Sequence, residues 1–247
     1  MSVGAGGLVR RAGVIAAGRG DRLRYHTHTL KPLVRVGGQT LIERVLLSLA
    51  EAGPTEVVII VNEASTAVKE HVTTSRTWPF TVRWIVETTP SSMHSFLRVV
   101  DTLAEDGDGG PFLLSTVDAI AAPGAFAAFA AAARERDADL TLAVAPPTDD
   151  ERPLLVSLDD EGARVAAIGT SVRSRAWATA GYYAVRPSVL READGARRDG
   201  VSTLRLFFER LLAHGYCVAA VPVSGGIDVD RLADVRAAES FLKQVGA

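Results

Sequence analysis

The chain has 247 residues, 47% of them hydrophobic and 23% charged, and its formal net charge is −2. These values are typical of a soluble globular protein, and they give no support for non-specific binding to nucleic acid or to a membrane surface. One cysteine, Cys217, excludes an internal disulfide framework and favours a reducing cytoplasm. No stretch is long and apolar enough to span a membrane, and the apolar run after Arg11 is too short for a secretory leader. Residues 1–7 are rich in glycine and predict a frayed lead-in.

The first predicted element is a buried strand at Ala12–Ala17, and a basic loop with spaced glycines follows it. Gly18 and Gly20 let the backbone turn sharply and bring its N–H groups close to an anion. Arg22 offers a forked donor for phosphate oxygens, and Lys31 offers a point charge. The pattern predicts a polyphosphate site at the carboxyl end of the first strand. It matches neither the Walker A loop nor the dinucleotide fingerprint, so on glycine spacing alone an ordinary turn is an equal alternative.

Strands and helices then alternate as far as residue 145. An apolar stripe predicts a helix over Leu41–Ala52, with Thr40 and Glu43 as a capping box. The β-branched run at 56–61 predicts a strand that is buried on both faces of a parallel sheet. Further along we expect a helix near 64–71, a strand at 81–86, a helix ending near 103, a strand at 111–116, a helix at 121–136 and a strand at 140–145. The run 106–110 is interpreted as a turn, because it lacks the later ligand positions of a calcium loop. This alternation is typical of a doubly wound α/β fold.

The pattern changes from Glu151 onwards. Residues 154–158 and 164–168 predict an antiparallel hairpin. The expected elements after it are a strand at 181–185, helices near 187–191 and 202–214, a strand at 216–221 and a helix at 232–245. No linker or repeat divides the chain. We therefore expect one domain over 1–247, with a nucleotide-binding half at about 12–120 and an acceptor-binding half at about 150–230.

Carboxylates follow two of the expected strands. Asp118 comes directly after the strand at 111–116, which places it at the same sheet edge as the Gly18 loop. Magnesium prefers one or two carboxylates together with phosphate oxygens, so Asp118 is a candidate metal ligand; capping of the next helix is the alternative. Asp228 and Asp230 lie at a second junction between strand and helix.

Several of these stretches resemble the signature of the nucleotidyltransferases that make sugar nucleotides and related activated compounds. The family pattern L-A-A-G-x-G-x-R-L, then K-P-L, is matched by IAAGRGDRL and by Lys31-Pro32-Leu33, and GGQTLIERVL follows as the next helix. Ile227–Asp234, IDVDRLAD, resembles the family's I-D-V-D-T-P-E-D-L. The chain is thus identified as a member of the group of sugar-nucleotide pyrophosphorylases and related cytidylyltransferases, the MobA-like NTP transferases. The resemblance implies a Rossmann-like glycosyltransferase-A type fold, with a mixed, mostly parallel sheet, flanking helices and a small antiparallel subsheet on the acceptor side.

The resemblance also implies a set of site residues. Those that bind the nucleotide would be Ala16, Ala17, Gly18, Gly20, Arg22, Lys31, Ser91 and Ser92, with Arg22 and Lys31 acting in catalysis. Mg²⁺ would be held by Asp118 and Asp228, and Asp230 would serve as a helix cap or outer-shell group. Val117 and Arg231 stand where the family usually has glycine and threonine.

The implied activity is Mg²⁺-dependent transfer of a nucleoside monophosphate from an NTP to a small phosphorylated acceptor, a sugar-1-phosphate or a phospho-alcohol, with release of pyrophosphate. The pyrophosphorylase patterns G-T-A-x-[AS]-L and E-K-P are missing. The loop PSSMHSF is closer to the N-S-L-Y-S-L of cytidylyltransferases that act on phosphocholine or inositol phosphate. Those enzymes often have I-G-K where this chain has Ile168-Gly169 without the lysine. The cations that follow here are Arg173 and Arg175. A molybdenum-cofactor type of nucleotidyltransferase and a non-catalytic nucleotide-binding descendant are the alternatives. A homo-oligomer is compatible with the sequence.

Overall fold

The computed structural model describes residues 9–105, 110–147, 153–172 and 177–246. The predicted lead-in at 1–7, most of the predicted turn at 106–110, and the two cations Arg173 and Arg175 lie outside these ranges. None of the described helices is long and apolar enough to cross a membrane.

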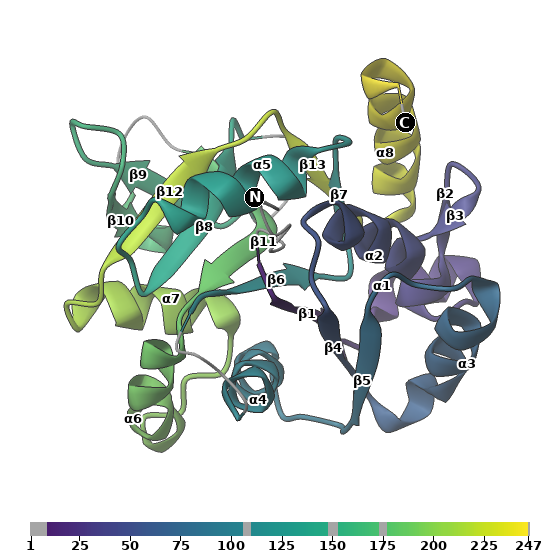
Figure 1. The fold of residues 1–247 in the computed structure, drawn as a ribbon, viewed down its shortest axis with the longest axis horizontal. Helices are drawn as coiled ribbons and strands as arrows, with labels where there is room; N and C mark the ends of the chain where they lie inside the picture. The colour runs from purple at the N-terminus through teal and green to yellow at the C-terminus, as the bar shows by residue number, and fades with distance from the viewer. Residues whose placement is uncertain (1–8, 106–109, 148–152, 173–176, 247) are drawn as a thin grey trace, which may run out of the picture.

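A mixed central sheet organises the molecule (Figure 1). Within the described residues it has nine strands, in the order β10-β9-β11-β6-β1-β4-β5, with β8 and β12 joined to it through β11. The strands are β1 (Arg11–Ala16), β4 (Glu56–Val61), β5 (Thr81–Val86), β6 (Phe112–Thr116), β8 (Leu140–Ala145), β9 (Leu155–Leu158), β10 (Val165–Ile168), β11 (Trp177–Val185) and β12 (Val218–Pro222). Strands β6, β1, β4 and β5 run parallel, whereas β11 is antiparallel to both β6 and β8.

Helices cover both faces of this sheet (Figure 1). They are α1 (Asp21–Thr27), α2 (Leu41–Glu51), α3 (Thr66–Ser75), α4 (Ser92–Ala104), α5 (Ala125–Arg134), α6 (Ala193–Arg198), α7 (Leu204–Ala213) and α8 (Leu232–Val245). One apolar core packs α4 and α7 against the sheet, and a second packs α2, α3 and α5 against the opposite face. In β4, Val58 and Ile60 belong to the first core while Val57 and Ile59 belong to the second, so the prediction of a strand buried on both faces is confirmed.

The structure differs from the predicted elements where short segments depend on tertiary contacts. The expected helix at 121–136 starts only at Ala125, because β7 (Ala119–Ala121) pairs with β13 (Gly226–Asp228) in a small antiparallel sheet. The loop after Gly18 contains α1, which was not expected. The segment expected as a helix near 187–191 is the 3₁₀ turn η4 (Pro187–Glu192), and α6 was also missed.

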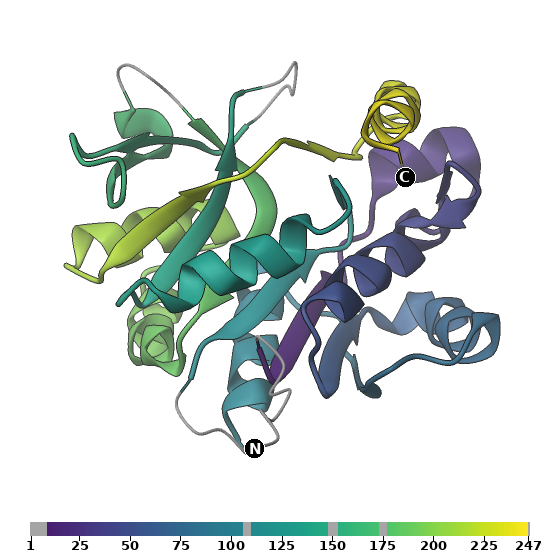
Figure 2. The same ribbon diagram turned by 45° about the horizontal axis from the view of Figure 1, so that its top comes forward.

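The pairing of β7 with β13 carries the segment after β12 across the molecule to α1 and α2. Figure 2 shows the segment after β12 crossing to α8, which lies beside α1. Ile120, Val229 and Leu242 pack with Leu23 and Leu41 in a third apolar cluster. In addition, the backbone N–H of Val229 donates to the carbonyl of Asp118 at 3.1 Å. These contacts place Asp228, which ends β13, and Asp230, two residues later, near Asp118, which follows β6.

Candidate functional site

A cleft of about 1050 Å³ opens where β1, β4 and β6 end at their carboxyl edges. Most of the predicted site residues line it: Ala17, Gly18, Gly20, Arg22, Lys31, Ser91, Ser92 and Asp118. Ala16 does not, since it is 1% exposed and packs in the core behind α2. Asp230, expected as a helix cap or outer-shell group, also lines the cleft, and so do Arg19, Arg24 and Asn62, which the sequence analysis did not single out. A site for a polyanion at this edge is consistent with the three arginines, two of them on α1 and one just before it.

The glycine loop and Lys31 fit together closely. Gly20 has φ +61°, and a Cβ added to it would lie 2.5 Å from the Cβ of Lys31. Only glycine allows both the backbone conformation and this approach. Lys31 starts the short 3₁₀ turn η1 (Lys31–Leu33), in which Pro32 fixes the backbone. The stem of Lys31 therefore packs against Gly20, and Lys31 lines the cleft.

The ammonium of Lys31 lies between two carboxylates. Its Nζ is 2.5 Å from Oδ2 of Asp118 and 2.5 Å from Oδ1 of Asp230, and the Lys31 side chain is 10% exposed. Burial lowers the pKa of Lys31, but the charges and hydrogen bonds of the two aspartates outweigh burial and raise it above its usual value. Burial raises the pKa of Asp118, whereas the charge of Lys31 and hydrogen bonds from Lys31 and Thr116 hold it below its usual range. One positive charge thus faces two negative ones.

Arg22 adds a second cation at the rim. One guanidinium nitrogen lies 3.6 Å from Oδ2 of Asp230, and its side chain is 56% exposed. This ion pair is open to solvent and contributes little to stability.

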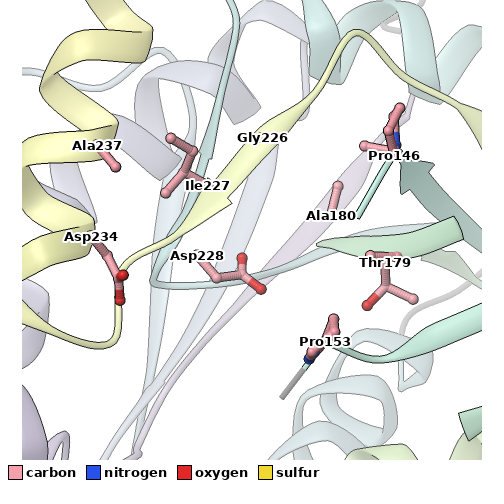
Figure 3. A pocket seen from close by; sticks show the side chains of 11 residues that line it. Pro146, Pro153, Thr179, Ala180, Gly226, Ile227, Asp228, Asp234 and Ala237 are labelled. Atoms are coloured by element: carbon pink, nitrogen blue, oxygen red, sulfur yellow. The ribbon is translucent and has the colours of Figure 1, made fainter. Parts of the chain in front are cut away.

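Asp228 and Asp230 occupy different places although they are two residues apart. Asp228 ends β13 and lines a small pocket beside the cleft, together with Thr179 and Asp234 (Figure 3). A Cβ added to Gly181 would lie 2.9 Å from Oδ1 of Asp228 and 3.0 Å from Oγ1 of Thr116. The assignment of Asp228 as a metal ligand stays a prediction.

Asp230 is not the residue that caps α8. The capping carboxylate is that of Asp234, which accepts from the backbone N–H groups of Asp230 and Arg231 at 3.0 and 2.8 Å. The side chain of Asp230 is therefore directed to Lys31 instead of to its own backbone. Of the described residues, no group of three or more His, Cys, Asp or Glu side chains is placed to hold a metal ion.

The predicted base-reading loop lies along one wall of the cleft. Ser91 Oγ is 2.8 Å from Nδ1 of His94, and Ser92 Oγ accepts from the backbone N–H of Leu204 at 3.0 Å. Both hydroxyls thus have a hydrogen-bond partner within the protein. Ser91 bonds to His94 at the start of α4, and Ser92 links α4 to the start of α7. A role of Ser91 and Ser92 toward the base stays a prediction.

Asn62 supports the glycine loop from below. Its Nδ2 donates to the carbonyl of Ala17 at 3.0 Å, and its Oδ1 accepts from Ser65 Oγ at 2.9 Å. The residue is 8% exposed. Its position directly after the strand at 56–61, at the same edge as Gly18, was a signal in the sequence that could have identified it.

Tyr183 of β11 is a further buried group near the aspartates. Burial raises its pKa, and the negative charges of Asp228 and Asp118 raise it further. Both carboxylates therefore act on the same phenol. Asp228 lines the neighbouring pocket, and its Oδ1 approaches Gly181 from the same side as Oγ1 of Thr116, which lines the cleft.

Comparisons with known proteins concern the family and the fold of the chain. The family model of the MobA-like NTP transferase domain matches residues 12–198. The inositol-1-phosphate CTP transferase from T. maritima has a similar structure, with a TM-score of 0.79 and 22% sequence identity over 96% of this chain and 98% of that one. A candidate glucose-1-phosphate thymidylyltransferase from Bacillus anthracis, in complex with sucrose, has a TM-score of 0.78 and 15% identity over 94% of each chain. The likeness to these two structures shows that this chain has a Rossmann-like fold. The matched family model shows that the chain belongs to the family of MobA-like NTP transferase domains.

Proposed function

We propose that the protein transfers a nucleoside monophosphate from an NTP to a small phosphorylated acceptor and releases pyrophosphate, in a reaction that requires Mg²⁺. The observation that carries this proposal is the buried Lys31 held between Asp118 and Asp230 at the base of the cleft. In this arrangement the ammonium of Lys31 is a cation that can bind phosphate oxygens, and Asp118 and Asp230 are carboxylates that can bind a metal ion. Membership of the NTP transferase family supports the reaction class.

The triphosphate would lie on the glycine loop and the start of α1. Gly18 and Gly20 line the cleft, and a Cβ added to Gly18 would meet nothing within 4 Å. Arg19, Arg22 and Arg24 surround the same loop. Together they would compensate the charge of the donor, which is the main requirement for binding it.

The two carboxylates fit a hard divalent cation. They already hold one cation, the ammonium of Lys31, at 2.5 Å from each of them. The pair Asp118 and Asp230 would hold Mg²⁺, and Lys31, displaced from it, would turn to the phosphates. When bound, the metal neutralises charge that is shared by the donor and acceptor phosphates. The competing assignment is Asp118 with Asp228.

The chemical step needs positioning more than a side-chain nucleophile. An oxygen of the acceptor phosphate forms a bond to the α-phosphorus of the NTP, and the bond from that phosphorus to the β-phosphate bridging oxygen breaks. The acceptor is largely ionised at neutral pH, since the second pKa of such phosphates is about 6, so no general base is required. Lys31 and Arg22 would stabilise the charge that develops on the leaving pyrophosphate.

The experiment is a pyrophosphate-release assay in which ATP, CTP, GTP, UTP and dTTP are crossed with sugar-1-phosphates, inositol phosphate, phosphocholine and other phosphorylated acceptors. Wild type would be compared with Asp118→Asn, Lys31→Met and the control Asp137→Asn, whose side chain is 99% exposed before β8. Release that needs Mg²⁺, survives in the control and falls at least a hundredfold in both site variants supports the proposal. Tight NTP binding without release for any acceptor supports the non-catalytic alternative.

The metal assignment has its own comparison. Mn²⁺ binding by electron paramagnetic resonance would be measured for Asp118→Asn, Asp228→Asn and Asp230→Asn in the presence of NTP. Weaker binding in the first and third variants supports the pair Asp118 and Asp230. Weaker binding in the first and second supports Asp228 instead.

A further inference from the structure

The ammonium of Lys31 occupies the space between two carboxylates of the cleft. Its Nζ lies 2.5 Å from Oδ2 of Asp118 and 2.5 Å from Oδ1 of Asp230. Distances between Mg²⁺ and its oxygen ligands in proteins are about 2.1 Å, so an ion needs the same space between such oxygens as an ammonium does. These two oxygens therefore cannot hold Lys31 and a metal ion at the same time.

The charges around the ammonium keep it there. The side chain of Lys31 is 10% exposed and that of Asp118 is 19% exposed, so water screens this ion pair little. The other oxygen of Asp230, Oδ2, lies 3.6 Å from a guanidinium nitrogen of Arg22, so both oxygens of Asp230 face a cation. A free divalent ion would have to displace a buried positive charge from its partners or be repelled by it at close range.

The stem of Lys31 is held by the glycine loop, and only its end can turn. A Cβ added to Gly20 would lie 2.5 Å from Cβ, 3.3 Å from Cγ and 3.1 Å from Cδ of Lys31. Rotation about the bonds beyond Cδ moves the ammonium while the packed carbons stay in place. Because Gly18, Gly20 and both aspartates line the same cleft as Lys31, an anion on the loop competes with the carboxylates for one ammonium.

We propose that Lys31 keeps the metal site closed until a triphosphate lies on the glycine loop. This inference rests on the proposed function and adds how its metal site is regulated. Phosphate oxygens attract the ammonium away from Asp118 and Asp230, which then become available to a divalent ion. Each ligand therefore raises the affinity for the other. A lysine that only bound phosphates would not affect metal binding in the absence of nucleotide, whereas here its removal opens the site.

The test is Mn²⁺ binding without nucleotide, measured by electron paramagnetic resonance on wild type, Lys31→Met and the control Lys69→Met, an exposed lysine of α3. Lys31→Met should bind Mn²⁺ at least about tenfold more tightly than wild type, because the competing charge is gone. Lys69→Met should stay within about twofold of wild type. Binding by Lys31→Met that is equal to or weaker than that of wild type would overturn the inference.

A second variant allows for the loss of stability expected of Lys31→Met. Lys31→Gln removes the charge but keeps a neutral hydrogen-bond donor, and it should show the same gain in Mn²⁺ affinity. In urea unfolding, Mn²⁺ alone should stabilise both variants more than wild type, because the ion supplies the positive charge that they lack. Equal stabilisation of wild type and variants would contradict a closed site.

A double variant identifies the second carboxylate. Lys31→Met combined with Asp230→Asn should lose the gain in Mn²⁺ affinity, since the opened site would then have Asp118 alone. A gain that is kept in full would show that Asp230 is not part of the closed site and would overturn the inference.

The movement of the ammonium can be followed in wild type. The chain has three lysines, Lys31, Lys69 and Lys243, so ¹³C labelling at the lysine Cε gives three NMR signals, and the two methionine variants assign them. Inorganic tripolyphosphate in EDTA should shift the signal of Lys31 alone, and Mg²⁺ without phosphate should shift none. A Lys31 signal that moves with Mg²⁺ alone would contradict the inference, as would tripolyphosphate that binds, seen by ³¹P NMR, and leaves that signal in place.

These outcomes separate the inference from the proposed function. Tighter Mn²⁺ binding by Lys31→Met, in a protein whose wild type releases no pyrophosphate, keeps the closed metal site and removes the reaction. Pyrophosphate release by wild type, together with unchanged Mn²⁺ binding by Lys31→Met, keeps the reaction and removes the closed site.

Discussion

The Cβ of Lys31 lies 2.5 Å from the place where a side chain at Gly20 would begin. The glycine loop and the buried lysine are therefore one packed unit, although eleven positions separate Gly20 from Lys31 in the sequence. Single substitutions can test this contact and the others that hold the site and the fold.

Gly20→Ala should displace Lys31. The variant has to accommodate both a φ of +61° and the contact with the Lys31 stem. We expect a loss of about 1–3 kcal/mol in the free energy of unfolding, measured with urea, and at least a tenfold fall in kcat/KM for the NTP. Gly162→Ala is the matched control, because Gly162 also has a positive φ, +70°, but open space around it. Equal losses in the two variants would show that backbone strain alone is responsible.

The ion pairs of Lys31 should be unequal in strength. The side chain of Asp118 is 19% exposed, whereas that of Asp230 is 41% exposed and therefore more screened by water. Lys31→Met leaves two facing carboxylates and is expected to cost about 3–5 kcal/mol. Asp230→Asn should cost less than about 1 kcal/mol, and Asp118→Asn an intermediate amount. A double variant of Lys31 and Asp118 that loses the full sum of the single losses would contradict a direct interaction.

Glu43 should make stability depend on acid pH. Burial raises the pKa of Glu43, but hydrogen bonds from Thr40 and the charge of His71 outweigh it and lower the pKa below 4.5. A lowered pKa in the folded state gives stability that is present above pH 4.5 and is lost as the pH falls through the folded-state value. Glu43→Gln should therefore be less stable than wild type at pH 7, and the difference should shrink below pH 4.5.

The control for this pH profile is Glu70→Gln, an exposed position on α3. Urea unfolding at a series of pH values measures both variants. A difference between wild type and Glu43→Gln that stays constant with pH would mean that the loss comes from packing and not from the charge.

Gly13 should report on the contact between β1 and α4. A Cβ added to Gly13 would lie 2.4 Å from Cγ1 of Val99 and 2.5 Å from Cδ2 of Leu114. Gly13→Ala is expected to cost about 1–3 kcal/mol through overpacking. Val99→Ala in the same chain should recover part of that loss, which a double-mutant cycle in urea would show; additive losses would contradict the contact.

The sequence predicted best those elements whose stability is local or whose burial is complete. The continuous β-branched run at 56–61 coincides with β4, since both of its faces are covered. The capping box of Thr40 and Glu43 is also present as predicted. Both are set by neighbouring residues and by simple periodicity.

What the sequence could not resolve depends on contacts between distant segments. The three-residue strands β7 and β13 exist only because they pair with each other. The alternation in IDVD would place Asp228 and Asp230 on one face of a strand. β13 ends at Asp228, however, and the chain turns into α8, so that Asp230 reaches Lys31 while Asp228 borders the small pocket. The local sequence does not indicate that β13 ends at Asp228, so it cannot separate the positions of Asp228 and Asp230.

The pairing of β13 with β7 also has a consequence for the order in which the protein becomes competent. Lys31 and Asp230, which share an ion pair, are 199 positions apart, and Asp230 is brought to the cleft only when β13 has docked. A chain still emerging from the ribosome therefore has its glycine loop and Asp118 long before Asp230 has been made. The two ion pairs of Lys31 are therefore completed only after β13 has been made and has paired with β7.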